Sequence, residues 1–225
     1  MCANYTPAKS ELLQQHFMVA PPDSAFPGEA FPGYMAPFIR PPYSDSVPGD
    51  RACALGMFGM VPHWADPTLA RQTYNARSET VATKPSFRHA FRHRQFCIIP
   101  VANFYEPSYE TGKPVRWEIS SADGSPLGIA GIWEHKQDGP NGLPLLSFSM
   151  LTINADAHPL MKRFHKPNEE KRMVAILAPE HYDDWLHCEV ADASDFLSCY
   201  PARKLAAHAA PRVPRSAHQS SLLDE

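Results

Sequence analysis

Cysteine stands at the second position of this chain, in the opening Met1-Cys2-Ala3-Asn4-Tyr5. Methionine aminopeptidase removes an initiator methionine when the next side chain is small, so we expect the processed chain to begin at Cys2. Its free α-amine and its thiol would then lie on adjacent carbons. The amine, with a pKa near ~7.7–8, is partly uncharged at neutral pH and can condense with an aldehyde. The thiol can add to the resulting imine and close a five-membered thiazolidine.

Cys2 also fits two other interpretations. The thiol could act alone as a nucleophile in acyl transfer, activated by a base or by the terminal amine. Alternatively, Cys2 is an ordinary buried cysteine without chemistry. The residues around it leave all three interpretations open.

Two further segments carry side chains suited to proton transfer. Glu106 stands at the end of an apolar strand, directly after the aromatic residues Phe104 and Tyr105, where partial burial would raise its pKa toward general acid–base use. His165 falls in an expected loop between a helix and a strand, where catalytic histidines are often found. The alternatives are a solvent-facing glutamate and one ordinary histidine among eleven. The other cysteines have no metal-ligand spacing, so we expect no metal site and no cofactor.

A basic segment runs from Arg71 to Arg94, where six lysines and arginines accompany the single acid Glu79. In a helix over residues 85–94, Arg88 and Arg92 would share an exposed side. The whole chain carries a net charge of -3, so any pull on a polyanion must come from a local patch such as this one. A solvated basic face without a partner is the alternative.

These side chains must be positioned by a sheet with few helices. Apolar runs predict strands at residues 96–101, 145–153 and 173–177, and a β-hairpin over residues 116–133. Helices are predicted over residues 7–19, with Thr6 as the cap, and over 85–94, 155–164 and 179–187. Strands outnumber helices and do not alternate with helical crossovers. The prediction is therefore an α+β fold, a single compact domain with a barrel-like mixed β core flanked by short helices.

Composition limits the class of protein. The 225 residues suffice for one large domain, and 44% hydrophobic and 20% charged residues are typical of a globular protein. Five cysteines without paired spacing indicate a reducing compartment, and no secretory signal or spanning segment is visible. We expect a cytoplasmic protein and a monomer.

Prolines concentrate at residues 21–48, where they exclude a helix. Large apolar side chains lie between them, which favours an ordered loop wrapped over the core rather than a disordered linker. Residues 211–225 lack periodicity and are predicted to form a flexible tail after a domain over residues 1–210.

Several short motifs together resemble those of the SOS-response-associated peptidase family, whose members process abasic sites in DNA. In chain order they are Met1-Cys2, Tyr34-Met35-Ala36-Pro37, Gly59-Met60-Val61-Pro62-His63-Trp64, Asn75-Ala76-Arg77-Ser78-Glu79-Thr80, Phe104-Tyr105-Glu106, and His165 before Arg172-Met173. They span residues 1 to about 178. The resemblance implies a compact α+β domain on a barrel-like β core.

The same resemblance implies roles for individual residues. Cys2 would join the DNA, Asn75 would hold the terminal amine or the sugar oxygen, and Glu106 would move protons. His165 would assist sugar ring opening and reversal. The DNA contacts would come from Arg77 and Arg172 on phosphates and from Trp64 and Pro37 on a neighbouring base, and the basic helix adds Arg88.

The chain departs from the family pattern next to Cys2. Family members usually continue Cys-Gly-Arg-Phe, whereas Ala3, Asn4 and Tyr5 follow here, so the cationic group normally close to the reacting residue is missing. Pro107 replaces the usual tryptophan after Glu106. Residues 167–171 form an apparent insertion between His165 and Arg172.

The resemblance implies a specific reaction and partner. The processed Cys2 would form a thiazolidine crosslink with the ring-opened abasic site of single-stranded DNA, with associated lyase and self-processing peptidase activity. The protein would associate with the nucleoid when bound to damaged DNA. One rival is an amidotransferase with an amino-terminal cysteine nucleophile, for which Asn141-Gly142 would have to form the oxyanion hole. The other rival is a module that binds single-stranded DNA without chemistry.

Overall fold

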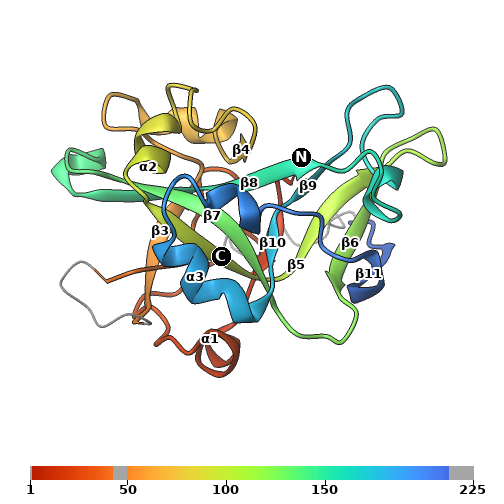
Figure 1. Ribbon diagram of the computed structural model, residues 1–225, viewed down its shortest axis with the longest axis horizontal. Coiled ribbons are helices and arrows are strands. Elements are labelled where there is room, and N and C mark those ends of the chain that lie inside the picture. The colour runs from red at the N-terminus through yellow and green to blue at the C-terminus, as the bar shows by residue number, and fades with distance from the viewer. Residues whose placement is uncertain (1, 43–49, 213–225) are drawn as a thin grey trace, which may run out of the picture.

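The computed structural model describes residues 2–42 and 50–212. One mixed sheet occupies the middle of the molecule, and the helices lie around its outside (Figure 1). In the described residues its strands are β1 (Tyr5–Pro7), β2 (Met35–Arg40), β3 (Ala52–Phe58), β4 (Asn75–Arg77), β5 (Phe96–Ser108), β6 (Val115–Ser121), β7 (Leu127–Lys136), β8 (Leu145–Asn154), β9 (Arg172–Val174), β10 (Ile176–Leu177) and β11 (Leu205–Ala209). The α-helices are α1 (Ser10–Phe17), α2 (Arg88–Arg92) and α3 (Tyr182–His187). Short 3-10 helices are Pro67–Gln72, Pro140–Gly142, Met161–Arg163, Pro179–His181, Ala193–Phe196 and Ala202–Lys204.

The sheet closes on itself. Its strand order is β10-β7-β8-β3-β2-β5-β6-β11, and β7 also pairs with β5. Strands β7, β8, β3, β2 and β5 therefore form a ring, which β2 completes through Ile39 opposite Ile98 of β5. Both parallel and antiparallel pairs occur, since β3 and β4 run parallel to β8. The predicted α+β fold with a barrel-like mixed core and short helices is confirmed.

The long strand β5 joins the barrel to a second group of strands. Residues Phe96–Val101 pair with β7, whereas Asn103–Ser108 pair with β6. On its other side, β5 pairs with β1, with Tyr5 opposite Phe104. In Figure 1, β6 and β11 lie at the end of the molecule opposite α2. The far half of β5, that is, its carboxyl-terminal half, thus lies beside the amino-terminal segment of the chain.

The predicted hairpin over residues 116–133 is wrong in its pairing. Both of its strands exist, as β6 and β7, but each pairs with a different half of β5. The first eight residues of β7 are buried, as expected for a barrel strand covered on both faces. The Asp123-Gly124 turn therefore connects two parts of the sheet.

Each of the four predicted helices differs from the observed structure. The first begins at Ser10 with Lys9 as its cap, because Thr6 and Pro7 are used in β1. Residues 155–164 form turns and one short 3-10 helix instead of an α-helix. The helix over residues 85–94 shortens to α2, and residues 179–187 form a 3-10 turn followed by α3. The three predicted strands are observed, with residues 96–101 extended into β5.

The proline-rich segment is ordered as far as residue 42, and residues 43–49 lie outside the described part. Instead of a loop throughout, it contributes β2, in which Pro37 and Phe38 are buried. Phe38 packs against Phe148 with ring centroids 5.4 Å apart, so this segment forms part of the barrel core. The core also holds Tyr5, Phe17, Phe58, Phe96, Phe104, Phe164 and Trp185.

Gly59 occupies a turn that only glycine fits. Its φ is +118°, and a Cβ there would overlap the backbone of Ala70. Because strain and overpacking add, we expect Gly59→Ala to lower the free energy of unfolding by about 2–4 kcal/mol in urea denaturation. Gly28→Ala is the control, since a Cβ at Gly28 meets nothing within 4 Å. Equal stability of both variants would contradict the packing at Gly59.

The carboxyl end is ordered slightly beyond the predicted boundary. Strand β11 ends at Ala209, and Arg212 still contacts Glu29 and Phe31. Residues 213–225, most of the predicted tail, lie outside the described residues. Within the described part, no helix has the length and apolar character needed to cross a membrane.

Candidate active site

Cys2 lies buried beside the far half of β5. The pairing of β1 with β5 carries the chain back to this position, and the Tyr105 backbone N–H donates to the Asn4 carbonyl at 3.0 Å. The Cys2 thiol donates to the same carbonyl at 3.5 Å. Only 1% of the Cys2 side chain is exposed. The amino-terminal residues are therefore held in place by the sheet.

Asn75 holds Cys2 from the opposite side. It begins β4, which lies parallel to β8 with Asn75 opposite Met150. The Asn75 Nδ2–H donates to the Cys2 carbonyl at 2.8 Å. Its Oδ1 is buried and has no hydrogen-bond partner among the described residues. That oxygen is a ready acceptor for an N–H or O–H group beside Cys2.

Glu106 extends from β5 into the same buried region and is 1% exposed. Burial raises the pKa of the Glu106 carboxyl to about 7, because a carboxylate is poorly solvated there. Near neutral pH this group is therefore populated in both protonation states. That is the property needed for general acid–base catalysis.

His165 faces Glu106, with its Nδ1 at 3.6 Å from Glu106 Oε2. Its backbone is left-handed, with φ of 63°, an uncommon conformation for a residue other than glycine. The His165 N–H donates to the Pro107 carbonyl at 2.8 Å, and the Lys171 ammonium donates to the His165 carbonyl at 3.3 Å. These contacts hold the imidazole toward β5.

The protonation state of His165 follows from its surroundings. Burial lowers the pKa of the imidazole to about 4, so it is neutral at pH 7. Its Nε2 lies 3.1 Å from the Arg172 carbonyl, which only accepts hydrogen bonds, so Nε2 carries the proton. Nδ1 is then the unprotonated nitrogen, and it is the one that faces Glu106.

The Cys2 thiol stays protonated in this setting. Burial, followed by the charge of Glu106, raises its pKa to about 12. The thiol is therefore a weak nucleophile until a neighbouring group accepts its proton.

Arg172 and Arg77 have different surroundings. Arg172 is buried and donates to both carboxylate oxygens of Glu79 at 2.9 Å, and to Glu170 at 2.8 Å. It thus anchors the start of β9, whose first carbonyl orients His165. The side chain of Arg77 is 50% exposed and pairs with Glu170 at 2.7 Å. Arg77 is the more accessible cation of the two.

The two residues predicted to pack on a neighbouring base differ in their exposure to solvent. The Trp64 side chain is 57% exposed, whereas Pro37 is buried in β2. Arg88 is exposed on α2. The structure therefore joins Cys2 to Asn75 by a hydrogen bond and places Glu106 against His165, with the Glu106 charge acting on the Cys2 thiol. Trp64, Arg77 and Arg88 are surface residues. Among the residues described, no three histidine, cysteine, aspartate or glutamate side chains gather as metal ligands.

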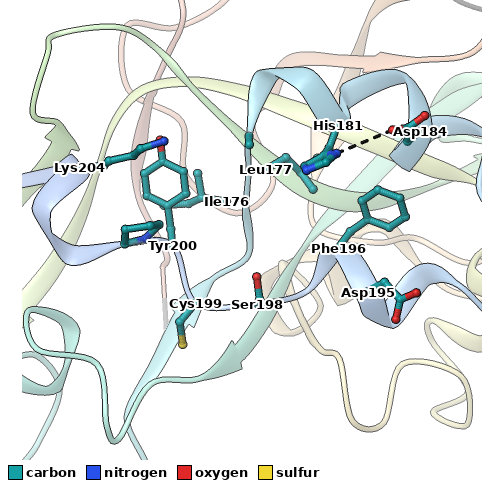
Figure 2. A pocket seen from close by; sticks show the side chains of 12 residues that line it. Ile176, Leu177, His181, Asp184, Asp195, Phe196, Ser198, Cys199, Tyr200 and Lys204 are labelled. Atoms are coloured by element: carbon teal, nitrogen blue, oxygen red, sulfur yellow. Dashed lines mark ion pairs between the residues drawn. The ribbon is translucent and has the colours of Figure 1, made fainter.

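A hollow of about 370 Å³ opens beside Glu106 and is also lined by Ala3, Asn4, Tyr105, Arg116 and Arg212. The two arginines were not predicted from the sequence, because neither stands in a motif. The register that places Arg116 opposite Pro107 was the missing information. Another hollow, of about 450 Å³, lies between Phe196 and Tyr200 and contains none of the predicted site residues (Figure 2).

Fold and site define a compact α+β protein in which Cys2 is buried near the amino terminus and Glu106 lies against His165 in the same region. The sequence profile of the SOS response associated peptidase (SRAP) family matches residues 1–214. The chain belongs to this family.

Similar proteins agree with this assignment. The chain is 33% identical over 139 residues to the abasic site processing protein YoqW of Bacillus subtilis, and 33% identical over 134 residues to YoaM of the same organism, which bears the same description. The matched region covers 60% and 58% of this chain, and only 57% and 54% of those relatives.

Solved structures show the same fold over nearly the whole chain. A crystal structure of a protein from Bordetella bronchiseptica is 39% identical, covers 94% of this chain and 100% of its own, and has a TM-score of 0.85. A protein from Bacteroides thetaiotaomicron is 22% identical, with a TM-score of 0.77 and coverage of 92% and 91%. The second likeness concerns the fold alone.

Proposed function

We propose that this protein binds single-stranded DNA at abasic sites and joins them covalently through a thiazolidine on the processed Cys2. One observation carries the proposal: Cys2, Asn75, Glu106 and His165 converge from four separate segments on one buried place. The names of YoqW and YoaM, which describe abasic site processing, support the same substrate. The protein would act as a monomer in the cytoplasm and associate with the nucleoid when bound to damaged DNA.

The first step is opening of the sugar. An abasic sugar is mostly a closed hemiacetal. His165 Nδ1, the unprotonated nitrogen, accepts the proton of the hydroxyl at C1, and protonated Glu106 gives a proton to the ring oxygen as the ring bond breaks. The imidazolium then returns its proton to the Glu106 carboxylate, 3.6 Å away. The product is an aldehyde next to the Cys2 amine, with both residues restored.

The second step joins protein and DNA. The Cys2 amine adds to the aldehyde carbon, and Asn75 Oδ1 accepts a hydrogen bond from that amine. Glu106 protonates the departing hydroxyl, so water and an iminium ion form. The resulting carboxylate accepts the thiol proton, and the sulfur adds to the iminium carbon. The ring closes with loss of one water overall, and Glu106 ends protonated as it began.

Two side reactions follow from the same intermediate. If the thiol does not add, the imine allows β-elimination of the DNA strand, which is a lyase activity. Reversal of the crosslink would use the same proton transfers backwards. The self-processing peptidase activity proposed for this chain is cleavage after Met1. It is an alternative to removal of Met1 by methionine aminopeptidase, and either route exposes the amine of Cys2.

Exposed side chains support the choice of single-stranded DNA. Trp64 can stack on an unpaired base, which an intact duplex would not offer. Arg77 and Arg88 provide exposed cations for phosphates. Arg172 is assigned a positioning role instead, because its buried guanidinium is already bound to two carboxylates.

The amidotransferase alternative is disfavoured by the position of Asn141-Gly142. These residues lie in the turn before β8, whose first residue is Leu145. Met150, which lies opposite Asn75, is five residues beyond Leu145. At ~3.3 Å per residue, Asn75 is therefore about 17 Å from the start of β8. An oxyanion hole needs donors within hydrogen-bonding distance of the reacting oxygen.

The direct test is incubation with a single-stranded oligonucleotide that carries one abasic site. We expect an adduct stable to heat and SDS. Its intact mass should equal that of the protein without Met1 plus the oligonucleotide, minus one water. An oligonucleotide with thymine at the same position is the control and should give no adduct. Binding of both oligonucleotides with equal affinity and without a covalent product would favour the purely binding module.

A further inference from the structure

A cluster of charged side chains lies at the rim of the hollow beside Glu106. Arg116 Nη2 donates to Asn4 Oδ1 at 2.8 Å and to Glu29 Oε1 at 2.6 Å. Arg212 pairs with the other oxygen of Glu29 at 3.6 Å. Two guanidinium groups thus share one carboxylate, which leaves one net positive charge in this cluster.

The Arg116 guanidinium is held in place. Its Cζ lies 3.3 Å from the centre of the Tyr105 ring, so the group rests on an aromatic face. The hydrogen bonds to Asn4 and Glu29 both use Nη2, and Nη1 has no hydrogen-bond partner among the described residues. A fixed guanidinium with an available N–H edge is a typical phosphate ligand.

The cluster is connected to the reacting residue by two hydrogen bonds. The Cys2 thiol donates to the carbonyl of Asn4, whose side chain accepts from Arg116. Glu106 and Arg116 also line the same hollow. DNA joined to Cys2 carries a phosphate on each side of the modified sugar. At least one of them needs a cation nearby, and residues 3–5 supply none.

We propose that Arg116 binds a phosphate next to the abasic sugar joined to Cys2, with Asn4 and Glu29 as its anchors and Arg212 as a second cation. This inference rests on the proposed function. It assigns to a residue of β6 the positive charge that the sequence next to Cys2 does not contain.

The test combines a substitution in the protein with modifications of the DNA, as in a double-mutant cycle. Each phosphate beside the abasic site is replaced in turn by a neutral methylphosphonate, and the rate of adduct formation is measured with wild type and Arg116→Gln. We expect one methylphosphonate to slow wild type by about tenfold, as loss of a charge-assisted hydrogen bond would. Arg116→Gln should be slowed similarly on normal DNA and be indifferent to that methylphosphonate. The slope of log rate against log salt concentration should be smaller in magnitude by ~0.7 for Arg116→Gln than for wild type.

The outcomes separate this inference from the proposed function. If wild type forms no adduct, the proposed function fails. A different outcome is that wild type reacts, but the methylphosphonate slows Arg116→Gln by as large a factor as it slows wild type. Arg116 then acts only through folding, and the phosphate role is overturned.

Glu29→Gln covers the case in which Arg116→Gln does not fold. It keeps an amide oxygen for Arg116 but removes the competing charge. We expect adduct formation about two- to fivefold faster at low salt, from loss of a partly exposed ion pair. An unchanged or lower rate with this variant would overturn the inference.

Discussion

Cys2→Ser should form no heat-stable adduct with abasic DNA, whereas wild type should convert most of the oligonucleotide. The serine variant keeps the α-amine and can still form an imine. Its hydroxyl is a far weaker nucleophile than sulfur, so the five-membered ring does not close and the imine hydrolyses. Borohydride, which reduces imines, should therefore trap the variant on DNA. Gel electrophoresis after heating, with and without borohydride, measures both outcomes.

Cys199→Ser is the matched control, because Cys199 is exposed and lies outside the site. It should form the adduct as wild type does. A heat-stable adduct of undiminished yield in Cys2→Ser would refute the thiazolidine. So would an intact mass showing that Met1 is retained, or that the amine of Cys2 is acetylated, in protein purified from its own host.

Glu106→Gln should slow adduct formation by about 10²–10⁴-fold, the usual contribution of one positioned acid–base group. The amide preserves size but cannot exchange protons. The dependence on pH should change as well. With a pKa of about 7, Glu106 loses its proton as the pH rises, so the acid needed for ring opening and water loss disappears above neutrality. The wild-type rate should fall there, and this alkaline limb should be missing in Glu106→Gln.

Glu118→Gln is the control for this substitution. Glu118 lies opposite Tyr105 on β6, close in the sheet but not among the site residues. It should react within about twofold of wild type, as expected for a surface substitution. Equal rates for Glu106→Gln and wild type across the pH range would remove Glu106 from the proposed chemistry. Circular dichroism of both variants checks that the fold is retained.

The expectation from the sequence and the structure agree on the environment of Glu106. An apolar strand before Glu106 predicts burial and a raised pKa, and burial does raise it to about 7. The pKa of the Cys2 thiol, about 12, was not predicted. It depends on neighbours that are distant in sequence. The raised pKa agrees with the proposed order of steps, in which the amine reacts first and the thiol second.

The sequence by itself determined which segments form strands, and its motifs indicated the candidate site residues. Cys2, Asn75, Glu106 and His165 were all found from local motifs, and the apolar runs of β5 and β8 predicted strands correctly. These features are local, since apolar spacing and side-chain type act on neighbouring residues.

Only the tertiary structure decided how those segments pair. The apolar runs in residues 116–133 fit a hairpin, but each strand pairs with its own half of β5. Likewise, Arg172 in isolation resembles a phosphate ligand, until Glu79 and Glu170 are brought beside it. The left-handed backbone of His165 and the anchored guanidinium of Arg116 depend on the same long-range contacts. Strand pairing and burial are set by the free energy of the whole core, which no local pattern contains.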